Sequence, residues 1–298
     1  MTDLVGFGLV NVDTVAVVPA WERDTKATAT RWIEQIGGPV PVAMCAAARL
    51  GSIAPCFIGT VGCDAAGDFI ASELAAYGVG AELARTPTSP TSRSMVMLDA
   101  RDGSRTLANH PGSVGRRCFT REEQAIIAGA RMVHCDARDL PATLDLVAMA
   151  RAGGAKVSWD LGTMRPGREE LFPLCDIVIA SKGGGAGAFP DRPGAVDQVR
   201  GFLDAGCSIA AVTLAEQGVV IGSRTLGIRS VPAVPVTCPK DTCGAGDTFH
   251  GAFLAELLRG SDPIQAAEFA CHAVAWRIQR YGHREGLPRR LDLDSSEA

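Results

Sequence analysis

The alternation of short β-branched runs with helical patterns is the feature that most constrains the fold of this chain. The runs typical of buried strands span residues 53–59, 131–135, 156–159, 176–180 and 209–214. The apolar periodicity of helices fills segments between them, at 65–77, 121–130, 140–152 and 196–205. Strands that alternate with helices at this spacing form parallel sheets with helices on both faces. The sequence therefore predicts an α/β fold with a doubly wound, mostly parallel central sheet.

Two segments interrupt this rhythm. Residues 14–36 mix charges with threonine and tryptophan, and residues 93–110 read as two extended runs joined at Asp102-Gly103, a pair typical of hairpin turns. We expect a small β lid built from these two excursions. No long linker and no internal repeat is present, so we predict a single catalytic domain over 1–298 that carries the lid. The open edge of such a lid invites pairing with a second copy, which predicts a homodimer through the lid.

Composition excludes several classes of partner. The chain has 298 residues, of which 47% are hydrophobic and 21% charged, as in soluble globular proteins. A net charge of -4 gives no basis for binding nucleic acid or an anionic membrane, and no run reaches the roughly 18 apolar residues of a membrane span. Ten cysteines without a Cys-x-x-Cys pair fit a reducing compartment. We therefore expect a cytoplasmic protein that acts on small molecules.

The strongest chemical signal is the junction of a loop and an apolar helix at residues 241–254. Thr242 is a candidate cap, and the next small residues leave the first backbone N–H groups open to a phosphate: Gly244, Ala245 and Gly246. Asp247 falls in the first helical turn, where the helix dipole favours a carboxylate. Beside a phosphate, this carboxylate would orient or deprotonate an attacking hydroxyl while the N–H groups stabilise the transferred group. The alternative is an acidic residue that merely begins a helix.

These residues resemble the carboxy-terminal signature of the PfkB, or ribokinase-like, family of carbohydrate and nucleoside kinases. Further segments are similar to the family in order and spacing: 6–13, 37–38 with the alanine-rich helix ending at 50–51, 59–67 and 212–218. Other stretches look most like ketohexokinase-like members: 31–32, 103–106 and 168–172. The resemblance implies a ribokinase-like fold, ATP with Mg²⁺, a lid that closes over a sugar, and transfer of the γ-phosphate to a hydroxyl with Asp247 as the base.

Position and resemblance together suggest substrate-binding residues. Asp13 ends an apolar strand at its carboxyl edge, where open parallel sheets bind ligands, and its carboxylate can accept hydrogen bonds from two sugar hydroxyls. The resemblance adds the Gly37-Gly38 pair, Arg105 on the second lid strand and Asp136 after an apolar strand. Each has a plainer interpretation: Asp13 and Asp136 as turn-capping residues, and Arg105 as a solvated hairpin arginine.

The resemblance also implies a nucleotide site. The turn with Thr213, Glu216 and Gly218 is assigned to the phosphates and ribose, although it could equally be a simple β-hairpin. Thr242 joins this set, and Asp241 is implied to lie near the metal or a monovalent cation; an Asx-turn would explain Asp241 as well. No residue is assigned as a direct metal ligand.

Departures from the family bear on the substrate. Sugar-binding members usually carry asparagines after the double glycine, whereas this chain has Pro39 and Val42, which cannot hydrogen-bond a polyol. The family's Asn-x-x-Glu pattern near Mg²⁺ is replaced at 181–184. We expect a sugar or sugar-like acceptor, with two alternatives: a nucleoside acceptor, or a non-catalytic sugar or nucleotide sensor on the same fold. His134 falls within a predicted strand and is interpreted as a satisfied core residue.

Overall fold

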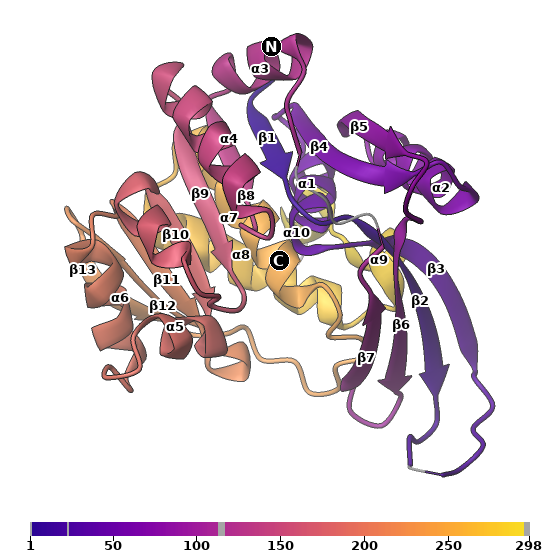
Figure 1. Cartoon of the computed structure of the whole chain (residues 1–298). Coiled ribbons are helices and arrows are strands. Elements are labelled where there is room, and N and C mark those ends of the chain that lie inside the picture. The colour runs from indigo at the N-terminus through magenta and orange to yellow at the C-terminus, as the bar shows by residue number, and fades with distance from the viewer. Residues whose placement is uncertain (1, 23, 113–116, 295–298) are drawn as a thin grey trace.

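A nine-stranded sheet forms the centre of the molecule (Figure 1). The computed structural model describes residues 2–22, 24–112 and 117–294. In order across the sheet, the strands are β13 (Gly227–Val231), β12 (Val219–Ser223), β11 (Ile209–Thr213), β10 (Ile177–Ser181), β9 (Lys156–Leu161), β8 (Met132–Cys135), β1 (Leu4–Phe7), β4 (Pro55–Gly62) and β5 (Gly80–Thr86). Neighbouring strands are parallel except at one edge, where β12 is antiparallel to β11 and to β13. The predicted mostly parallel sheet is confirmed.

Helices cover both faces of this sheet (Figure 1) and divide the interior into two cores. One core includes α1 (Pro39–Leu50), α2 (Ala65–Ala76), α7 (Ala245–Arg259) and α8 (Pro263–Ile278). The other includes α3 (Arg121–Ala128), α4 (Leu140–Ala152) and α6 (Ala195–Asp204). Successive strand residues serve opposite cores, as Leu4 and Val5 of β1 do, and both are fully buried. Strands with two buried faces need apolar residues throughout, which explains the continuous runs in the sequence.

Shorter elements connect these layers. They are the helices α5 (Lys182–Ala188), α9 (Gly282–Gly286) and α10 (Arg290–Asp294) and the 3₁₀ helices η1 (Arg168–Leu174) and η2 (Ala215–Gln217). None of the helices within the described ranges is both long and apolar enough to cross a membrane. All ten cysteines lie in those ranges and are free thiols.

A second, four-stranded sheet projects beside the central one (Figure 1). Its order is β3 (Arg31–Gly37), β2 (Asn11–Val18), β6 (Ser92–Asp99) and β7 (Arg105–His110). The β2 and β6 strands are parallel, and the outer pairs are antiparallel. A small core of its own holds the sheet together: Val15, Val17, Val96 and Leu98. The β6–β7 hairpin turns at Asp102-Gly103, the pair that indicated a turn in the sequence, and its strands come from the two segments that interrupt the α/β alternation.

Candidate active site

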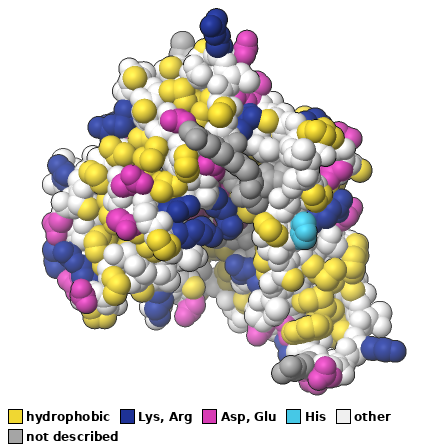
Figure 2. Space-filling view, viewed as in Figure 1, with side chains coloured by type: hydrophobic (Ala, Val, Ile, Leu, Met, Phe, Trp, Pro, Cys, Tyr) yellow, Lys and Arg dark blue, Asp and Glu magenta, His cyan; other side chains and the backbone are white. Residues whose placement is uncertain are grey.

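A pocket of about 270 Å³ lies where the carboxyl ends of several central strands meet the start of α7. Figure 2 shows a hollow in the middle of the molecule's face with Lys and Arg side chains gathered around it. Among the site residues expected from the sequence, the pocket is lined by Arg105, Asp136, Thr213, Gly244, Gly246 and Asp247. Several residues that the sequence did not single out as ligand-binding also line it: Pro39, Arg138, Asp160, Thr163, Arg165 and His250. The pocket thus joins segments that lie more than a hundred residues apart.

The start of α7 presents bare backbone to this pocket. Gly244 precedes the helix in the left-handed region, with φ of +75°, and no side chain caps the helix. A Cβ atom at Gly244 would lie 2.6 Å from the His283 ring, so only glycine fits there. Among the described residues, the N–H groups of Gly246 and Asp247 have no hydrogen-bond acceptor, and a Cβ at Gly246 would meet open space. This arrangement is suited to binding a phosphoryl group.

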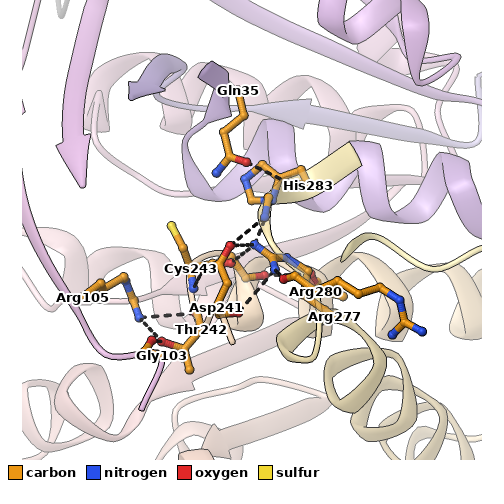
Figure 3. Close-up of polar contacts among 12 residues, drawn as sticks. Gln35, Gly103, Arg105, Asp241, Thr242, Cys243, Arg277, Arg280 and His283 are labelled. Carbon is orange, nitrogen blue, oxygen red and sulfur yellow. Dashed lines mark hydrogen bonds and ion pairs between the residues drawn. The ribbon is translucent and has the colours of Figure 1, made fainter. Parts of the chain in front are cut away.

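Thr242 does not cap α7, so that part of the sequence interpretation is wrong. Its hydroxyl instead donates a hydrogen bond to the carbonyl oxygen of Gly103 at 2.8 Å and accepts one from Arg105 at 3.2 Å. The left-handed turn at Gly244 separates Thr242 from the helix and leaves it facing the β6–β7 hairpin. The contact ties the second sheet to the loop before α7 (Figure 3).

Asp247 is the third residue of α7, and its carboxylate has no hydrogen-bond partner among the described residues. Loss of solvation raises the pKa of Asp247 well above its ordinary value, and the nearby charge of Asp160 raises it further, while Arg105 opposes the shift. Burial also raises the pKa of Asp160, to about 6. A carboxylate with a raised pKa is a stronger base, and this one borders the pocket beside the bare N–H groups.

A buried ion pair supports the loop that leads into α7 (Figure 3). Asp241 and Arg277 of α8 are both fully buried, and their side chains approach to 3.0 Å. The remaining capacity of the Asp241 carboxylate is taken by the N–H groups of Cys243, at 2.8 Å, and Gly282, at 2.9 Å. Asp241 therefore forms the Asx-turn that the sequence left open, and it does not line the pocket. The ion pair fixes the backbone directly before Gly244.

Arg277 and His283 extend this network toward the second sheet. Arg277 also donates to the carbonyl oxygens of Cys243 and Arg280. The backbone N–H of His283 donates to the side-chain oxygen of Gln35 on β3 at 2.9 Å (Figure 3). One fully buried guanidinium thus organises the loop before α7, the end of α8 and the start of α9.

Asp13 and the double glycine form a second buried unit at the base of the second sheet. The Asp13 carboxylate accepts hydrogen bonds from Asn11 and Ser94, and burial raises the pKa of Asp13 to about 6. A Cβ atom at Gly37 would overlap this carboxyl group, and one at Gly38, whose φ is +103°, would overlap the carbonyl oxygen of Leu9. Steric demand therefore accounts for both glycines. None of the three residues lines the pocket, whereas the adjacent Pro39 does.

The β11–β12 connection has the hairpin geometry that the sequence left open. Thr213, at the end of β11, lines the pocket, while Glu216 in η2 and Gly218 do not. Ala245 also lies outside the lining, although it begins α7. A larger cavity of about 850 Å³ adjoins residues 231–235 and the α7–α8 pair, and none of the expected site residues lines it.

His134, Asp160 and His250 form a cluster that sequence reasoning missed. Candidate ligand atoms of all three lie within 4.8 Å of one another, and burial lowers the pKa of each histidine to about 3, which keeps both rings neutral. His134 Nδ1 pairs with the Ser158 hydroxyl at 3.1 Å, but His134 Nε2 and His250 Nδ1 have no hydrogen-bond partner in the described ranges. His134 is thus a core residue that is only half satisfied. Two imidazoles and a carboxylate are a donor set able to hold a divalent transition metal.

The fold and the site together define a class: an α/β protein with unpaired helix N–H groups and an unpaired carboxylate at the carboxyl edge of its sheet, within the described residues. Residues 1–290 match the model of the pfkB family carbohydrate kinases. The chain therefore belongs to the pfkB family, whose members are phosphotransferases that act on an alcohol group.

Individual relatives agree with this assignment. A ribokinase of Haemophilus influenzae is 25% identical over 297 residues, which is 96% of this chain and 95% of the relative. A mouse ketohexokinase is 24% identical over 283 residues, 90% of this chain and 93% of that protein. Because ribokinases match as well, the ketohexokinase-like stretches mark one similarity among several.

Solved structures share the fold. Arabidopsis thaliana ribokinase complexed with ribose and ATP superposes with a TM-score of 0.85 at 22% identity, over 99% of this chain and 98% of the other. A putative ribokinase II from E. coli in complex with ATP and Mg²⁺ gives the same TM-score at 23% identity and the same coverage. The expected ribokinase-like fold is confirmed.

Proposed function

We propose that this kinase transfers the γ-phosphate of ATP to a hydroxyl of a sugar or sugar-like molecule bound in the pocket. One observation carries the proposal: the Asp247 carboxylate, unpartnered and with a raised pKa, borders the pocket beside the unpaired N–H groups of Gly246 and Asp247. In a phosphoryl transfer, a base takes the proton of the attacking hydroxyl, and hydrogen-bond donors beside it stabilise the transferred phosphoryl group. The ATP complexes of the Arabidopsis and E. coli proteins of the same fold support ATP as the donor.

The reaction follows from these positions. The acceptor oxygen forms a bond to the γ-phosphorus as the bond from that phosphorus to the β–γ bridging oxygen breaks, and ADP leaves. Asp247 takes the hydroxyl proton on its carboxylate, and the backbone from Gly244 to Asp247, including Ala245, stabilises charge on the transferred group. The raised pKa of Asp247 favours this proton transfer, and the dry surroundings that raise it also strengthen the hydrogen bonds to the phosphoryl oxygens.

Magnesium has suitable donors in the pocket. Mg²⁺ prefers oxygen ligands and retains several waters, and the Asp160 carboxylate in the pocket lining would hold it, which leaves Asp247 free as the base. When bound, it would neutralise charge on the β- and γ-phosphates. We place the nucleotide near Thr213, Glu216 and Gly218, on the β11 side of the pocket. Asp241 and Thr242 act on that site through the loop they hold, since Asp241 is already saturated by Arg277 and backbone N–H groups.

The second sheet serves as a lid over the acceptor. Its hairpin reaches the loop before α7 through Gly103 and Arg105, which both contact Thr242. Asp13, Gly37 and Gly38 lie at its base, and Arg105 and Asp136 line the pocket itself. A lid anchored at these points would exclude water during transfer. Because Pro39 gives the pocket an apolar wall, a nucleoside acceptor remains the second candidate.

An ADP-release screen tests the function. Ketoses, aldoses, sugar acids and nucleosides are each incubated with ATP and Mg²⁺, using the wild type and Asp247→Asn as the matched control. We expect turnover of at least one acceptor class, reduced about 100- to 10,000-fold in the variant. Wild-type turnover by Asp247→Asn would reject the base, and thermal stabilisation by ligands without ADP formation would favour the sensor alternative.

The second sheet also offers a dimer interface. Its edge strands β3 and β7 are open, and Trp32 and Met95 on this sheet are 63% and 51% exposed. Such edges and apolar side chains favour pairing with a second copy. Light scattering of the purified protein measures the mass in solution. A monomer at micromolar concentration would exclude this arrangement, and Trp32→Arg is expected to weaken a dimer.

A further inference from the structure

Three arginines converge on the pocket from different elements. Arg105 comes from β7, Arg138 from the loop after β8, and Arg165 from the loop after β9. Basic side chains surround the central hollow in Figure 2. The lining also contains the carboxyl groups of Asp136, Asp160 and Asp247, so the pocket holds charges of both signs.

Two of these guanidinium groups have no hydrogen-bonded partner in the part of the chain that the structure describes. There, Arg138 forms one ion pair, with Asp136 at 3.9 Å, and the Asp136 carboxylate already accepts hydrogen bonds from the N–H groups of Leu9 and Arg138 itself. The Arg165 side chain has no hydrogen bond or ion pair to any described residue. Burial lowers the pKa of Arg165, and the nearby charge of Arg138 lowers it further, while the charge of Asp136 opposes the shift.

The neighbouring Arg168 behaves differently. Its guanidinium donates to the carbonyl oxygens of Ala137 and Arg138, both at 3.1 Å, and to that of Pro166. Arg168 does not line the pocket. It therefore holds the loop that carries Arg138, while Arg138 and Arg165 are left free to meet a ligand.

The position of these loops favours the acceptor over the nucleotide. In the sheet order β11-β10-β9-β8-β1, Thr213 lies at the β11 end, and Arg138 follows β8, next to β1. Asp136, two residues before Arg138, bonds the N–H of Leu9 in the connection that leads to Asp13. Arg138 thus lies on the side of the pocket that the proposed function gives to the acceptor, and Arg165 lies near it on the loop after the neighbouring strand β9.

We infer that Arg138 and Arg165 form a subsite for a negatively charged group on the acceptor, so that the substrate is an acidic sugar-like molecule with a carboxylate or phosphate besides its reacting hydroxyl. This inference rests on the proposed function. Guanidinium groups bind such anions through paired, charge-assisted hydrogen bonds. The inference also gives a reason for Pro39: recognition by charge replaces the hydroxyl contacts that an apolar wall cannot make.

Matched acceptors test the inference. Fructose is compared with fructose 6-phosphate, and glucose with gluconate, by ADP release with ATP and Mg²⁺; the two pairs separate phosphate from carboxylate. We expect kcat/KM to be at least about 10-fold higher for the charged member of one pair. Arg138→Gln and Arg165→Gln should each raise KM for that member about 10- to 100-fold, with kcat and the KM for ATP nearly unchanged.

The control variant is Arg200→Gln, which removes an exposed arginine paired with Asp197 on α6, far from the pocket lining. It should leave both KM values unchanged. Equal or better use of the neutral members, or a rise in the KM for ATP in place of the acceptor KM, would overturn the inference while the kinase assignment stands.

Calorimetric titration without ATP separates this inference from the proposed function. The wild type and Arg138→Gln are titrated with fructose 6-phosphate and gluconate. Binding by the wild type that Arg138→Gln loses, together with no ADP release in the whole panel, would reject the proposed function and retain the subsite. Failure of both charged probes to bind or react would overturn the subsite.

Discussion

The two ends of the pocket are built in opposite ways. At the transfer end, Asp241 and Arg277 are fully buried and saturated, and they fix the backbone before Gly244. At the proposed acceptor end, Arg138 and Arg165 have no hydrogen-bonded partner among the described residues and lie in the same pocket lining as the apolar Pro39. A rigid, internally paired support suits a step common to all acceptors, whereas unpaired side chains on loops can select one acceptor. Under the proposed function, different parts of this fold therefore carry out the chemistry and select the acceptor.

The largest expected effect is on turnover. Asp247→Asn should lower kcat about 100- to 10,000-fold and leave the acceptor KM within a factor of about three, because the amide keeps the shape but cannot take a proton. Arg138→Gln should instead raise the acceptor KM and leave kcat nearly unchanged. Steady-state kinetics with the best acceptor measures both. Loss of kcat in Arg138→Gln equal to that in Asp247→Asn would erase the distinction between the two ends.

The second-largest expected effect is on the free energy of unfolding, which should differ between the two ends of the pocket. Arg277→Met leaves Asp241 as an unpaired buried charge and should reduce the free energy of unfolding by about 3 to 5 kcal/mol. The matched change Arg138→Met, at a side chain that is 37% exposed, should alter it by less than about 1 kcal/mol. Urea unfolding followed by circular dichroism gives both values. The double variant Arg277→Met with Asp241→Asn should recover part of the lost free energy of unfolding. If it recovers none, the buried ion pair is not the cause of the loss.

A smaller stability effect is expected at Asp160, between the two ends. Its folded-state pKa of about 6 lies above the ordinary 3.8, so the folded protein holds this proton more tightly. The charged carboxyl therefore destabilises the fold above about pH 6, and this penalty disappears as the pH falls toward 4. Asp160→Asn should raise the stability at pH 8 by about 1 to 3 kcal/mol and have little effect at pH 4. Thermal melts of the wild type and Asp160→Asn at both pH values measure this difference. Equal shifts of the melting temperature at pH 4 and pH 8 would contradict the titration of Asp160.

The smallest effect is a shift of the pH profile. The charge of Asp160 raises the pKa of Asp247, so Asp160→Asn should lower it and move the acid limb of kcat/KM to lower pH. Asp145→Asn, at an exposed position of α4, serves as the control and should leave the limb in place. A limb that moves to higher pH in Asp160→Asn would show that Asp160 does not act on the base through its charge.

Short segments of the sequence were enough to predict much of the fold and the transfer end of the pocket. The strand runs and helical periods gave the central sheet, Asp102-Gly103 gave the hairpin, and residues 241–254 gave the helix start with Asp247. These features depend on local periodicity and backbone geometry, which neighbouring residues determine. The capping role of Thr242 failed because a left-handed residue after it, Gly244, turned its hydroxyl toward a hairpin more than 130 residues away.

What the sequence alone determined is thus much of the alternation of strands and helices, the β6–β7 hairpin, and the helix start that carries Asp247. Only the tertiary structure decided which strand ends became neighbours, because the order β9-β8-β1 is set by packing across the whole sheet. That order brings Arg138 beside Arg165 and gathers His134, Asp160 and His250, none of which are adjacent in sequence. It also left Asp241 to pair with Arg277, 36 residues away, in place of a ligand. These partners are set by the packing of residues far apart in the sequence, and no short segment of the sequence predicts them.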